Sequence, residues 1–171
     1  MNEHVVLVDE QDREVGTEEK LAAHRAGRLH RAFSVFVFDM RDNLLLQRRA
    51  DGKYHSAGLW SNTCCGHPRP GEDTGAAAHR RLREEMGFDC PLTHQFSFIY
   101  RAELERGLVE HELDHVFTGR HADPPEPDPV EVGEWRRTPV PALLSDLDRN
   151  GPRYSAWLKT ALDGLRERGV C

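Results

Sequence analysis

The sequence predicts an α/β fold in which a mixed β-sheet lies between helices, built as a single domain over residues 1–171. Strand-like and helix-like segments are intermixed along the chain, which favours a mixed sheet covered by helices. Short polar turns join neighbouring apolar segments into hairpins. The length suits one domain with a real core, and 38% hydrophobic with 30% charged residues is an ordinary soluble composition. We find no internal repeat and no interdomain linker.

The N-terminal elements are expected to be a short strand and a short helix. Residues 5–8 are apolar and predict the strand. Thr17 is expected to cap the helix, with Glu18 and Glu19 in its first turn, near the positive end of the helix dipole. Gly27 is expected to end this helix because glycine readily adopts the left-handed conformation of a helix C-cap.

A hairpin follows. Residues 33–38 are strongly strand-like, residues 39–43 form a polar turn, and residues 44–47 return as a second strand. A long loop over residues 49–70 comes next. A helix is predicted over residues 74–86, and its ion pairs at i,i+4 spacing are Arg80 with Glu84 and Arg81 with Glu85.

The C-terminal half alternates strands, a loop and a helix. Residues 96–100 and 113–118 are strand candidates, and the proline-rich residues 124–129 form a surface loop. Pro152 is expected to open a terminal helix that ends at Gly169. The apolar face of this helix comprises Tyr154, Trp157, Leu158, Ala161, Leu162 and Leu165.

Composition excludes several classes of protein. No apolar run approaches the length of a membrane span, and Met1-Asn2-Glu3-His4 lacks a signal pattern, so we expect a cytoplasmic protein. A net charge of −6 argues against a nucleic-acid binder. We expect a monomer. The cysteines show no disulfide framework and are expected to be free thiols: Cys64, Cys65, Cys90 and Cys171.

One stretch carries most of the chemical information. Asn62-Thr63-Cys64-Cys65-Gly66-His67-Pro68 places a thiol and an imidazole at the mouth of a loop and runs directly into a glycine-and-glutamate pattern that ends at Phe88. Glycines let such a loop turn sharply, and glutamates on one face of the following helix hold a hard divalent cation against phosphate oxygens. The pattern predicts metal-assisted diphosphate binding beside a reactive thiol. The alternative is an amphipathic surface helix with i,i+4 ion pairs.

Residues 66–88 resemble the Nudix box, with Gly66-x5-Glu72-x7-Arg80-Arg81-Leu82-Arg83-Glu84-Glu85-Met86-Gly87. The resemblance implies a Nudix-like fold. One departure is Arg81, which stands where a Nudix hydrolase has glutamate. A cation in place of a metal-binding anion weakens the case for hydrolysis and suits direct contact with phosphate.

The flanking motifs look like type I isopentenyl-diphosphate isomerase, in that family's order from Gly16 to Trp157. They are Arg28-Leu29-His30, Arg48-Arg49-Ala50, Asn62 to Pro68, Phe98-x-Tyr100-Arg101-Ala102 and Glu110-His111-Glu112. The resemblance implies interconversion of isopentenyl and dimethylallyl diphosphate by protonation and deprotonation through a carbocation-like state. Water must be kept out of such a site because it would trap the cation.

The same resemblance implies the catalytic residues. Cys65 and Glu112 match the acid–base pair on opposite faces of the substrate, and Tyr100 matches a tyrosine that hydrogen-bonds to that glutamate. Trp157 matches a tryptophan whose ring faces the carbocation, although its helical position alone indicates a core residue. The direction of each proton transfer stays open.

Two metal ions are implied. The resemblance gives the ligands of the first as His24, His30, His67, Glu110 and Glu112. Three imidazoles with two carboxylates favour Mn²⁺ or Zn²⁺ over Mg²⁺. The family spaces its first two histidines by one residue more, so His24 must reach the ion from a shorter loop. The second ion is Mg²⁺ on the diphosphate, with Glu85 as its protein ligand. The other histidines are read as surface residues: His4, His55, His79, His94 and His121.

The diphosphate contacts match or neighbour those of the family, and paired arginines suit bidentate recognition of phosphate. They are Lys20, Arg48, Arg49, Lys53 and Arg81. Two other functions are possible. A Nudix pyrophosphohydrolase would use Glu84 and Glu85 to position metals, but Arg81 argues against it. A metal sensor would use Cys64, Cys65 and His67 and would leave the arginines unexplained.

Overall fold

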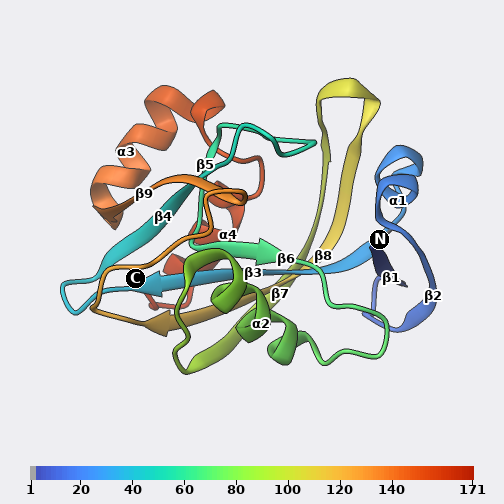
Figure 1. Ribbon diagram of the computed structural model, residues 1–171, viewed down its shortest axis with the longest axis horizontal. Coiled ribbons are helices and arrows are strands. Elements are labelled where there is room, and N and C mark those ends of the chain that lie inside the picture. Colours follow the sequence, from blue (N-terminus) through green and yellow to red (C-terminus); the bar gives the residue numbers. More distant parts are fainter. Residues whose placement is uncertain (1–2) are drawn as a thin grey trace.

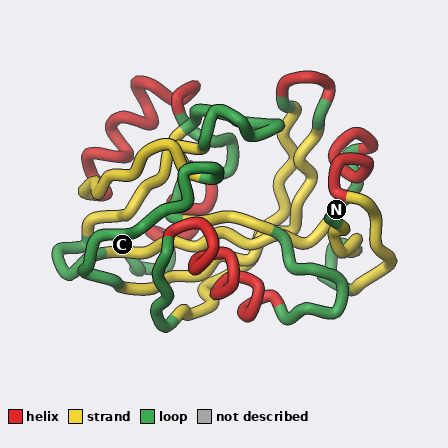
Figure 2. Tube along the Cα trace, viewed as in Figure 1, coloured by secondary structure: helices red, strands yellow, loops and turns green. Residues whose placement is uncertain are grey.

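A mixed β-sheet of nine strands forms the middle of the molecule in the computed structural model, which describes residues 3–171 (Figures 1 and 2). The strands are β1 (His4–Val8), β2 (Glu14–Glu19), β3 (His30–Phe38), β4 (Asn43–Arg49), β5 (Trp60–Ser61), β6 (Cys64–Gly66), β7 (Leu92–Glu103), β8 (Val109–Arg120) and β9 (Val132–Pro139). The helices are α1 (Lys20–Ala26), α2 (Thr74–Met86), α3 (Val140–Asn150) and α4 (Leu158–Glu167), with single 3₁₀ turns η1 (Glu105–Gly107) and η2 (Gly151–Arg153). The predicted α/β architecture is confirmed.

Strand β3 organises the sheet. It runs parallel to β8 along its whole length, from the pair His30 with Glu112 to the pair Phe38 with Arg120. It is antiparallel to β1, β4 and β6. Strand β7 extends the sheet beyond β8, and β9 pairs with β4. A strand with neighbours of both directions makes the sheet mixed.

The two faces of β3 face different helices because alternate side chains of a strand point to opposite faces. Phe33, Val35 and Val37 pack in a buried cluster with apolar side chains of α2. Phe36 and Phe38 pack in a second cluster with α3 and α4. Figure 1 shows α2 on one side of the sheet and α3 and α4 on the other. The face of β3 that carries Phe36 and Phe38, its even-numbered face, also carries His30 and Ser34, two residues of the site described below.

Locally determined elements are as predicted. Helix α2 covers residues 74–86, capped by the side chain of Asp73, which accepts the N–H of Ala76. Gly27 ends α1 with a left-handed φ of 66°. The predicted strands lie within β1, β3, β4, β7 and β8, the proline-rich segment is a loop, and all four cysteines are free. The start of the N-terminal tetrapeptide, Met1 and Asn2, lies outside the described residues.

The predicted start of the first helix is wrong. Thr17 lies in β2, where it pairs with Val6 of β1. Glu19 caps α1 instead, and its carboxylate accepts the N–H groups of Leu21 and Ala22. Strand pairing across the β1–β2 hairpin therefore decides the boundary over the capping preference of threonine.

The C-terminal part also differs from the expectation. Gly151–Arg153 form a 3₁₀ turn, so α4 begins at Leu158 and Trp157 precedes it. Strand β9 and helix α3 were not predicted, nor were β5 and β6 within the long loop. In the part of the chain that the structure describes, the helices are too short or too polar to cross a membrane.

Gly87 closes α2, and its replacement by alanine is expected to destabilise the protein strongly. Its φ is 73°, and an added Cβ would lie 2.2 Å from the carbonyl oxygen of Glu126. Gly107 has a similar φ of 71° but open space around it. Gly107→Ala therefore isolates the cost of the left-handed backbone, about 1 kcal/mol. Gly87→Ala should cost clearly more in urea unfolding, at an unchanged m value. Equal losses for the two variants would refute the steric argument.

Candidate active site

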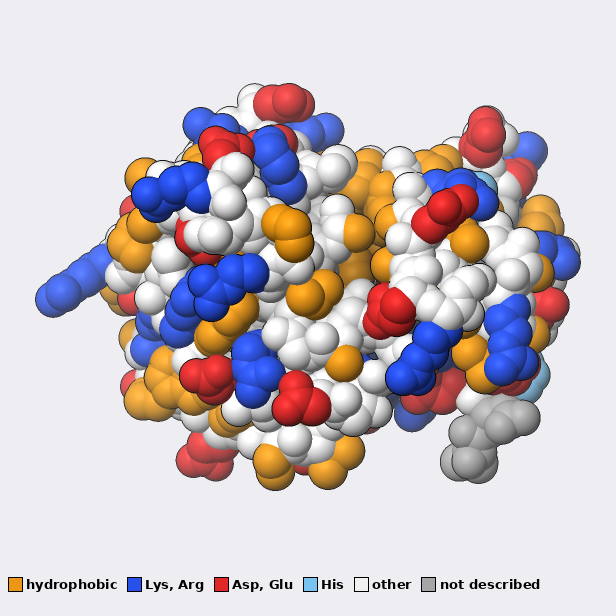
Figure 3. All heavy atoms as spheres, turned by 90° about the horizontal axis from the view of Figure 1, so that it is seen from above, with side chains coloured by type: hydrophobic (Ala, Val, Ile, Leu, Met, Phe, Trp, Pro, Cys, Tyr) orange, Lys and Arg blue, Asp and Glu red, His pale blue; other side chains and the backbone are white. Residues whose placement is uncertain are grey.

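A cavity of about 690 Å³ opens beside the even-numbered face of β3. Seen from above, the surface of the molecule is hollowed near its middle, where hydrophobic side chains are visible (Figure 3). The cavity is lined by most of the residues that the sequence singles out: Lys20, Arg49, Lys53, Cys65, His67, Arg81, Glu85, Tyr100, Glu110, Glu112 and Trp157.

Strand register explains why residues distant in sequence meet here. Cys65 on β6 lies opposite Ser34 of β3, and Glu112 on β8 lies opposite His30 of the same strand. Tyr100 on β7 is the cross-strand partner of Glu112. Paired residues of neighbouring strands share a face of the sheet. All five side chains therefore lie on one face.

The adjacent cysteines point to opposite faces. Cys64 is fully buried in the cluster beneath α2, and its thiol donates to Glu85 Oε2 at 2.8 Å. Cys65 is half-buried and lines the cavity. Because successive residues of a strand alternate, only one of the two thiols can face the site. Cys65 is therefore the cysteine that faces the cavity.

The Cys65 thiol is held by two buried neighbours. It donates to Asn62 Oδ1 at 3.1 Å, and the Trp157 indole N–H lies 3.0 Å from the same oxygen and 3.2 Å from Cys65 Sγ. Asn62 is anchored by its amide N–H groups, which donate to the carbonyls of Val35 and Cys64. Burial, and after it the Asp114 carboxylate, raise the pKa of Cys65 to about 12, so the group is a thiol at neutral pH.

Glu112 lies at the centre of a polar network. Its Oε2 is 2.8 Å from His67 Nε2 and 3.3 Å from His30 Nε2. The Tyr100 hydroxyl donates to Glu112 Oε1 and also to Glu110 Oε2, at 3.1 Å in the second contact. Burial opposes ionisation of Glu112, but His67 and His30 outweigh it and hold the pKa of Glu112 well below its usual range. Burial, and then the charge of Glu112, raise the pKa of Glu110 well above its usual range.

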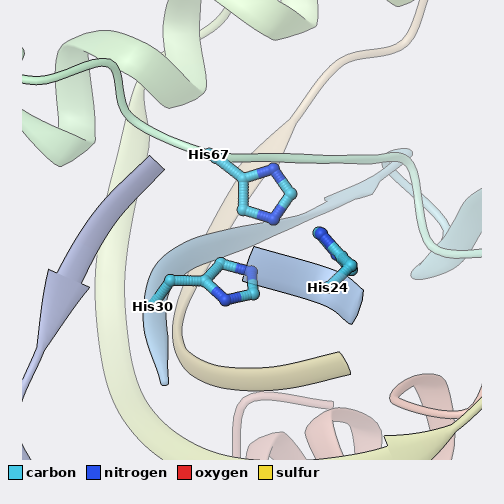
Figure 4. Close-up of side chains that lie close together, drawn as sticks. All are labelled: His24, His30 and His67. Carbon is cyan, nitrogen blue, oxygen red and sulfur yellow. The ribbon is translucent and has the colours of Figure 1, made fainter. Parts of the chain in front are cut away.

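Three histidines converge beside Glu112. The rings of His24, His30 and His67 face one another (Figure 4), and one nitrogen from each lies within 4.8 Å of the others. His24 Nδ1 donates to the Lys20 carbonyl at 2.7 Å, and His30 Nδ1 donates to the Arg28 carbonyl at 2.8 Å. These bonds leave the Nε2 lone pairs of both rings free to face the cluster.

The cluster fits a divalent metal ion. His24 and His30 are fully buried; among residues 3–171 the Nε2 atom of His24 has no hydrogen-bond partner, and that of His30 has a 3.3 Å contact with Glu112 Oε2 that does not meet hydrogen-bond geometry. Buried polar atoms are rarely left so, and a bound cation would satisfy both. The short spacing between the two histidines does not keep His24 away from the cluster. His24 lies on α1, and its ring centroid is 4.9 Å from that of His30.

His55 is buried, so its reading as a surface residue is wrong. Only 4% of it is exposed, its Nε2 lies 3.4 Å from Glu110 Oε1, and its ring stacks near that of His24 at 5.5 Å. Burial, and after it the charge of Arg49, lower the pKa of His55 to about 2, so the imidazole is neutral. The remaining four histidines of that group are exposed or half-buried: His4, His79, His94 and His121.

Two of the cationic side chains that line the cavity, Arg81 and Lys53, form ion pairs with carboxylates. Arg81 lies 3.0 Å from Glu85, 2.7 Å from Glu84 and 3.3 Å from Glu131. Lys53 also pairs with Glu131. Burial disfavours the charged guanidinium, but Glu85 and the neighbouring acids raise the pKa of Arg81 above its usual value. Glu131 thus joins the two cations that the sequence assigns to diphosphate.

The structure does not bring Arg48 to the cavity, which corrects one predicted contact. Its guanidinium bonds Glu134 at 3.0 Å and Asp51 at 3.2 Å on the far side of β4. Arg49 is the neighbour that faces inward, where it lies 5.8 Å from the Trp157 ring. Strand pleating allows only one of two consecutive arginines to point into the site.

Several residues of the site were missed by sequence reasoning. Asp114 continues the alternation of Glu110 and Glu112 along β8, a signal that could have identified it. Ser34 donates to Asp114 Oδ2 at 2.7 Å and lies 3.7 Å from Cys65 Sγ. Burial, and then Glu112, raise the pKa of Asp114 well above its usual range. His55 and Glu131 lie in loops and carry no such pattern.

Comparisons with known proteins agree with this geometry. The NUDIX domain family matches residues 28–158. An isopentenyl-diphosphate Delta-isomerase 1 from Aromatoleum aromaticum is 55% identical over 163 residues, which cover 95% of this chain and 92% of the relative. An isopentenyl-diphosphate Delta-isomerase 2 from Photorhabdus laumondii is 52% identical over 170 residues, covering 99% and 96%.

Solved structures share the fold at low identity. DR0079 from Deinococcus radiodurans superposes with a TM-score of 0.73 at 21% identity, covering 86% of this chain and 90% of its own. A MutT protein from Methanosarcina mazei gives 0.68 at 16% identity, covering 82% and 95%. Identity near 50% over almost the whole length is far more specific than this common fold. The chain therefore belongs to the isopentenyl-diphosphate delta-isomerase family, built on a NUDIX domain.

Proposed function

We infer that the protein is an isomerase that interconverts isopentenyl diphosphate and dimethylallyl diphosphate. The observation that carries this inference is the meeting of the Cys65 thiol and the Glu112 carboxylate in one cavity of a chain whose relatives are isopentenyl-diphosphate isomerases. The alternative of a Nudix pyrophosphohydrolase is not favoured, because the relatives are isomerases and Arg81 replaces a metal-binding glutamate.

Cys65 and Glu112 are proposed as the acid–base pair. Their partners on β3, Ser34 and His30, are four residues apart, so the backbone positions of Cys65 and Glu112 are separated by about 13 Å along the strand direction. The alkene would lie between the two side chains, with one group adding a proton to one carbon and the other removing a proton from the neighbouring carbon. Tyr100 would orient Glu112 through the hydroxyl that it donates.

The surroundings of Cys65 suit a cationic reaction. Trp157 is almost fully buried, and its indole N–H fixes the ring against Cys65 and Asn62. The face of an indole stabilises a nearby cation by roughly 0.5–2 kcal/mol. We propose that the ring shields the carbocation-like state and that its apolar body keeps water from the reacting carbons.

The proposed resident metal is Mn²⁺ or Zn²⁺, held by His24, His30, His67, Glu110 and Glu112. When bound, the ion would supply a fixed positive charge that orients Glu112 and tunes the acidity of its carboxyl group. Separately, Glu85 would hold Mg²⁺ on the diphosphate. Glu85 is buried and placed between Cys64 and Arg81.

We propose Lys20, Arg49, Lys53 and Arg81 as the diphosphate contacts. Lys20, Lys53 and Arg81 are paired with carboxylates in this structure, Lys20 with Glu3 and the other two with Glu131. Phosphate oxygens accept the same charge-assisted hydrogen bonds and could replace these partners.

We also propose that the enzyme acts as a monomer of one domain in the cytoplasm. Four free thiols suit a reducing compartment, and the net charge of −6 suits a protein that binds no nucleic acid. Light scattering of the purified protein at several concentrations checks the oligomeric state.

The test of function is direct. Purified protein incubated with isopentenyl diphosphate and a mixture of Mg²⁺ and Mn²⁺ should form the dimethylallyl isomer and release no phosphate, as followed by ³¹P and ¹H NMR. Release of phosphate would favour the hydrolase. Absence of either product under these conditions would contradict both enzymatic functions.

A further inference from the structure

Two overlapping sets of potential ligands surround His24. One consists of His24, His30 and His67, and the other of His24, His55 and Glu110. Within each set, the ligand atoms lie within 4.8 Å of one another. Two ligands of one ion are separated by about 3–4 Å when each bond is about 2.1 Å. His24 belongs to both sets, so a cation bound by His24 would lie beside the other members of each.

We propose that His55 is a further ligand of the metal centre, which then holds four imidazoles rather than three. This rests on the metal centre proposed above and adds to it a residue that the sequence motifs do not contain. His55 is supplied by the loop between β4 and β5, and that loop reaches the centre from the side of Glu110.

The present partners of His55 leave its Nε2 available. The 3.4 Å separation from Glu110 Oε1 is longer than the roughly 2.9 Å of a good N–H···O bond. The other ring nitrogen, Nδ1, lies 3.1 Å from Ser56 Oγ, which can accept its proton. An imidazole that donates through Nδ1 presents the Nε2 lone pair to an ion. His24 and His30 use the same arrangement with backbone carbonyls.

The backbone around His55 is held in a costly conformation. Ser56 has a positive φ of 52°, which is unfavourable for a residue with a side chain, and its N–H donates to the Glu105 carboxylate at 2.6 Å. Arg49 donates to the His55 carbonyl at 3.3 Å. These contacts fix the loop with the imidazole inside, where only 4% of the residue is exposed. Such strain persists where a side chain must be aimed at a site.

A competing role is that His55 only donates a hydrogen bond to Glu110 and never touches the ion. Loss of an outer partner of this kind also weakens metal binding, by about 10-fold to 100-fold. Affinity alone therefore cannot separate the two roles, and the number of bound imidazoles must be counted.

The experiment counts them in the Co²⁺-loaded protein. Each coordinated histidine keeps one ring N–H, which gives an exchangeable, strongly shifted proton signal in the paramagnetic NMR spectrum. The wild-type protein should show four such signals, and His55→Gln should show three with a Co²⁺ affinity at least about 10-fold weaker. His111→Gln is the matched control, because His111 lies between Glu110 and Glu112 on the other face of β8, and it should keep all four.

The outcomes separate the two proposals. Three signals in the wild-type protein, reduced to two in His24→Gln, would leave the metal centre standing and overturn the role of His55. Failure of the wild-type protein to bind Co²⁺ would overturn both the metal centre and this inference, while the isomerase assay reports independently on function. The wild-type count does not depend on whether His55→Gln folds.

Discussion

Cys65→Ala is expected to lower kcat for isomerisation by at least about 10²-fold and up to about 10⁴-fold, the usual contribution of a positioned acid or base. Alanine removes the thiol that Asn62 and Trp157 hold at the cavity wall. KM should change little, because the proposed diphosphate contacts are elsewhere in the cavity. The measurement is a steady-state assay with isopentenyl diphosphate, with circular dichroism to confirm the fold.

Cys90→Ala is the matched control for this prediction. Cys90 is also a buried thiol, but it packs in the cluster beneath α2 and does not line the cavity. Its loss should leave kcat within about 2-fold of the unmodified protein and cost only packing energy, about 1 kcal/mol. Near-normal turnover of Cys65→Ala would show that the thiol does not transfer a proton, and the mechanism would have to be abandoned.

Glu112→Gln is expected to have an effect at least as large. The amide keeps the size of the side chain and can still accept from Tyr100, but it cannot exchange a proton with carbon and is a poor metal ligand. We expect a loss in kcat of roughly 10²-fold to 10⁴-fold together with weaker Mn²⁺ binding. Turnover is measured at saturating Mn²⁺, and binding by electron paramagnetic resonance of the free ion.

Glu103→Gln serves as its control. Glu103 is the last residue of β7, next to the turn that joins β7 to β8, and its side chain is 80% exposed. It should leave both turnover and Mn²⁺ binding unchanged. If Glu112→Gln recovered full turnover once the ion is saturating, Glu112 would be a metal ligand alone, and another group would have to complete the acid–base pair.

The sequence predicted well where interactions are local. Helix α2 begins and ends at the predicted residues because an Asp73 cap, i,i+4 ion pairs and Gly87 all lie within the segment itself. The prediction that Thr17 caps a helix was wrong for the opposite reason, since Thr17 pairs with Val6 of β1, eleven residues away in the chain. Strand pairing is decided by packing that no local propensity contains.

For the site, the motifs identified the chemical groups but not their orientation. Which cysteine of Cys64 and Cys65, and which arginine of Arg48 and Arg49, faces the cavity is a question of sheet pleating. The resemblance pointed to Cys65, the cysteine that lines the cavity, but it retained both arginines, of which only Arg49 lines it. His55 carried no signal, because a histidine in a polar loop looks the same whether the loop folds inward or lies on the surface.

The sequence alone determined the fold class, the family and the thiol beside a Nudix-like helix, because these depend on local periodicity and on a dense run of motif residues. Only the tertiary structure decided how the groups meet. Register along β3 brings Cys65, Glu112 and His30 to one face, α1 and the loop after β6 add His24 and His67, pleating points Cys64 and Arg48 away from the cavity, and loop closure buries His55 against Glu110. These outcomes depend on contacts between distant segments, which form only when the sheet is complete.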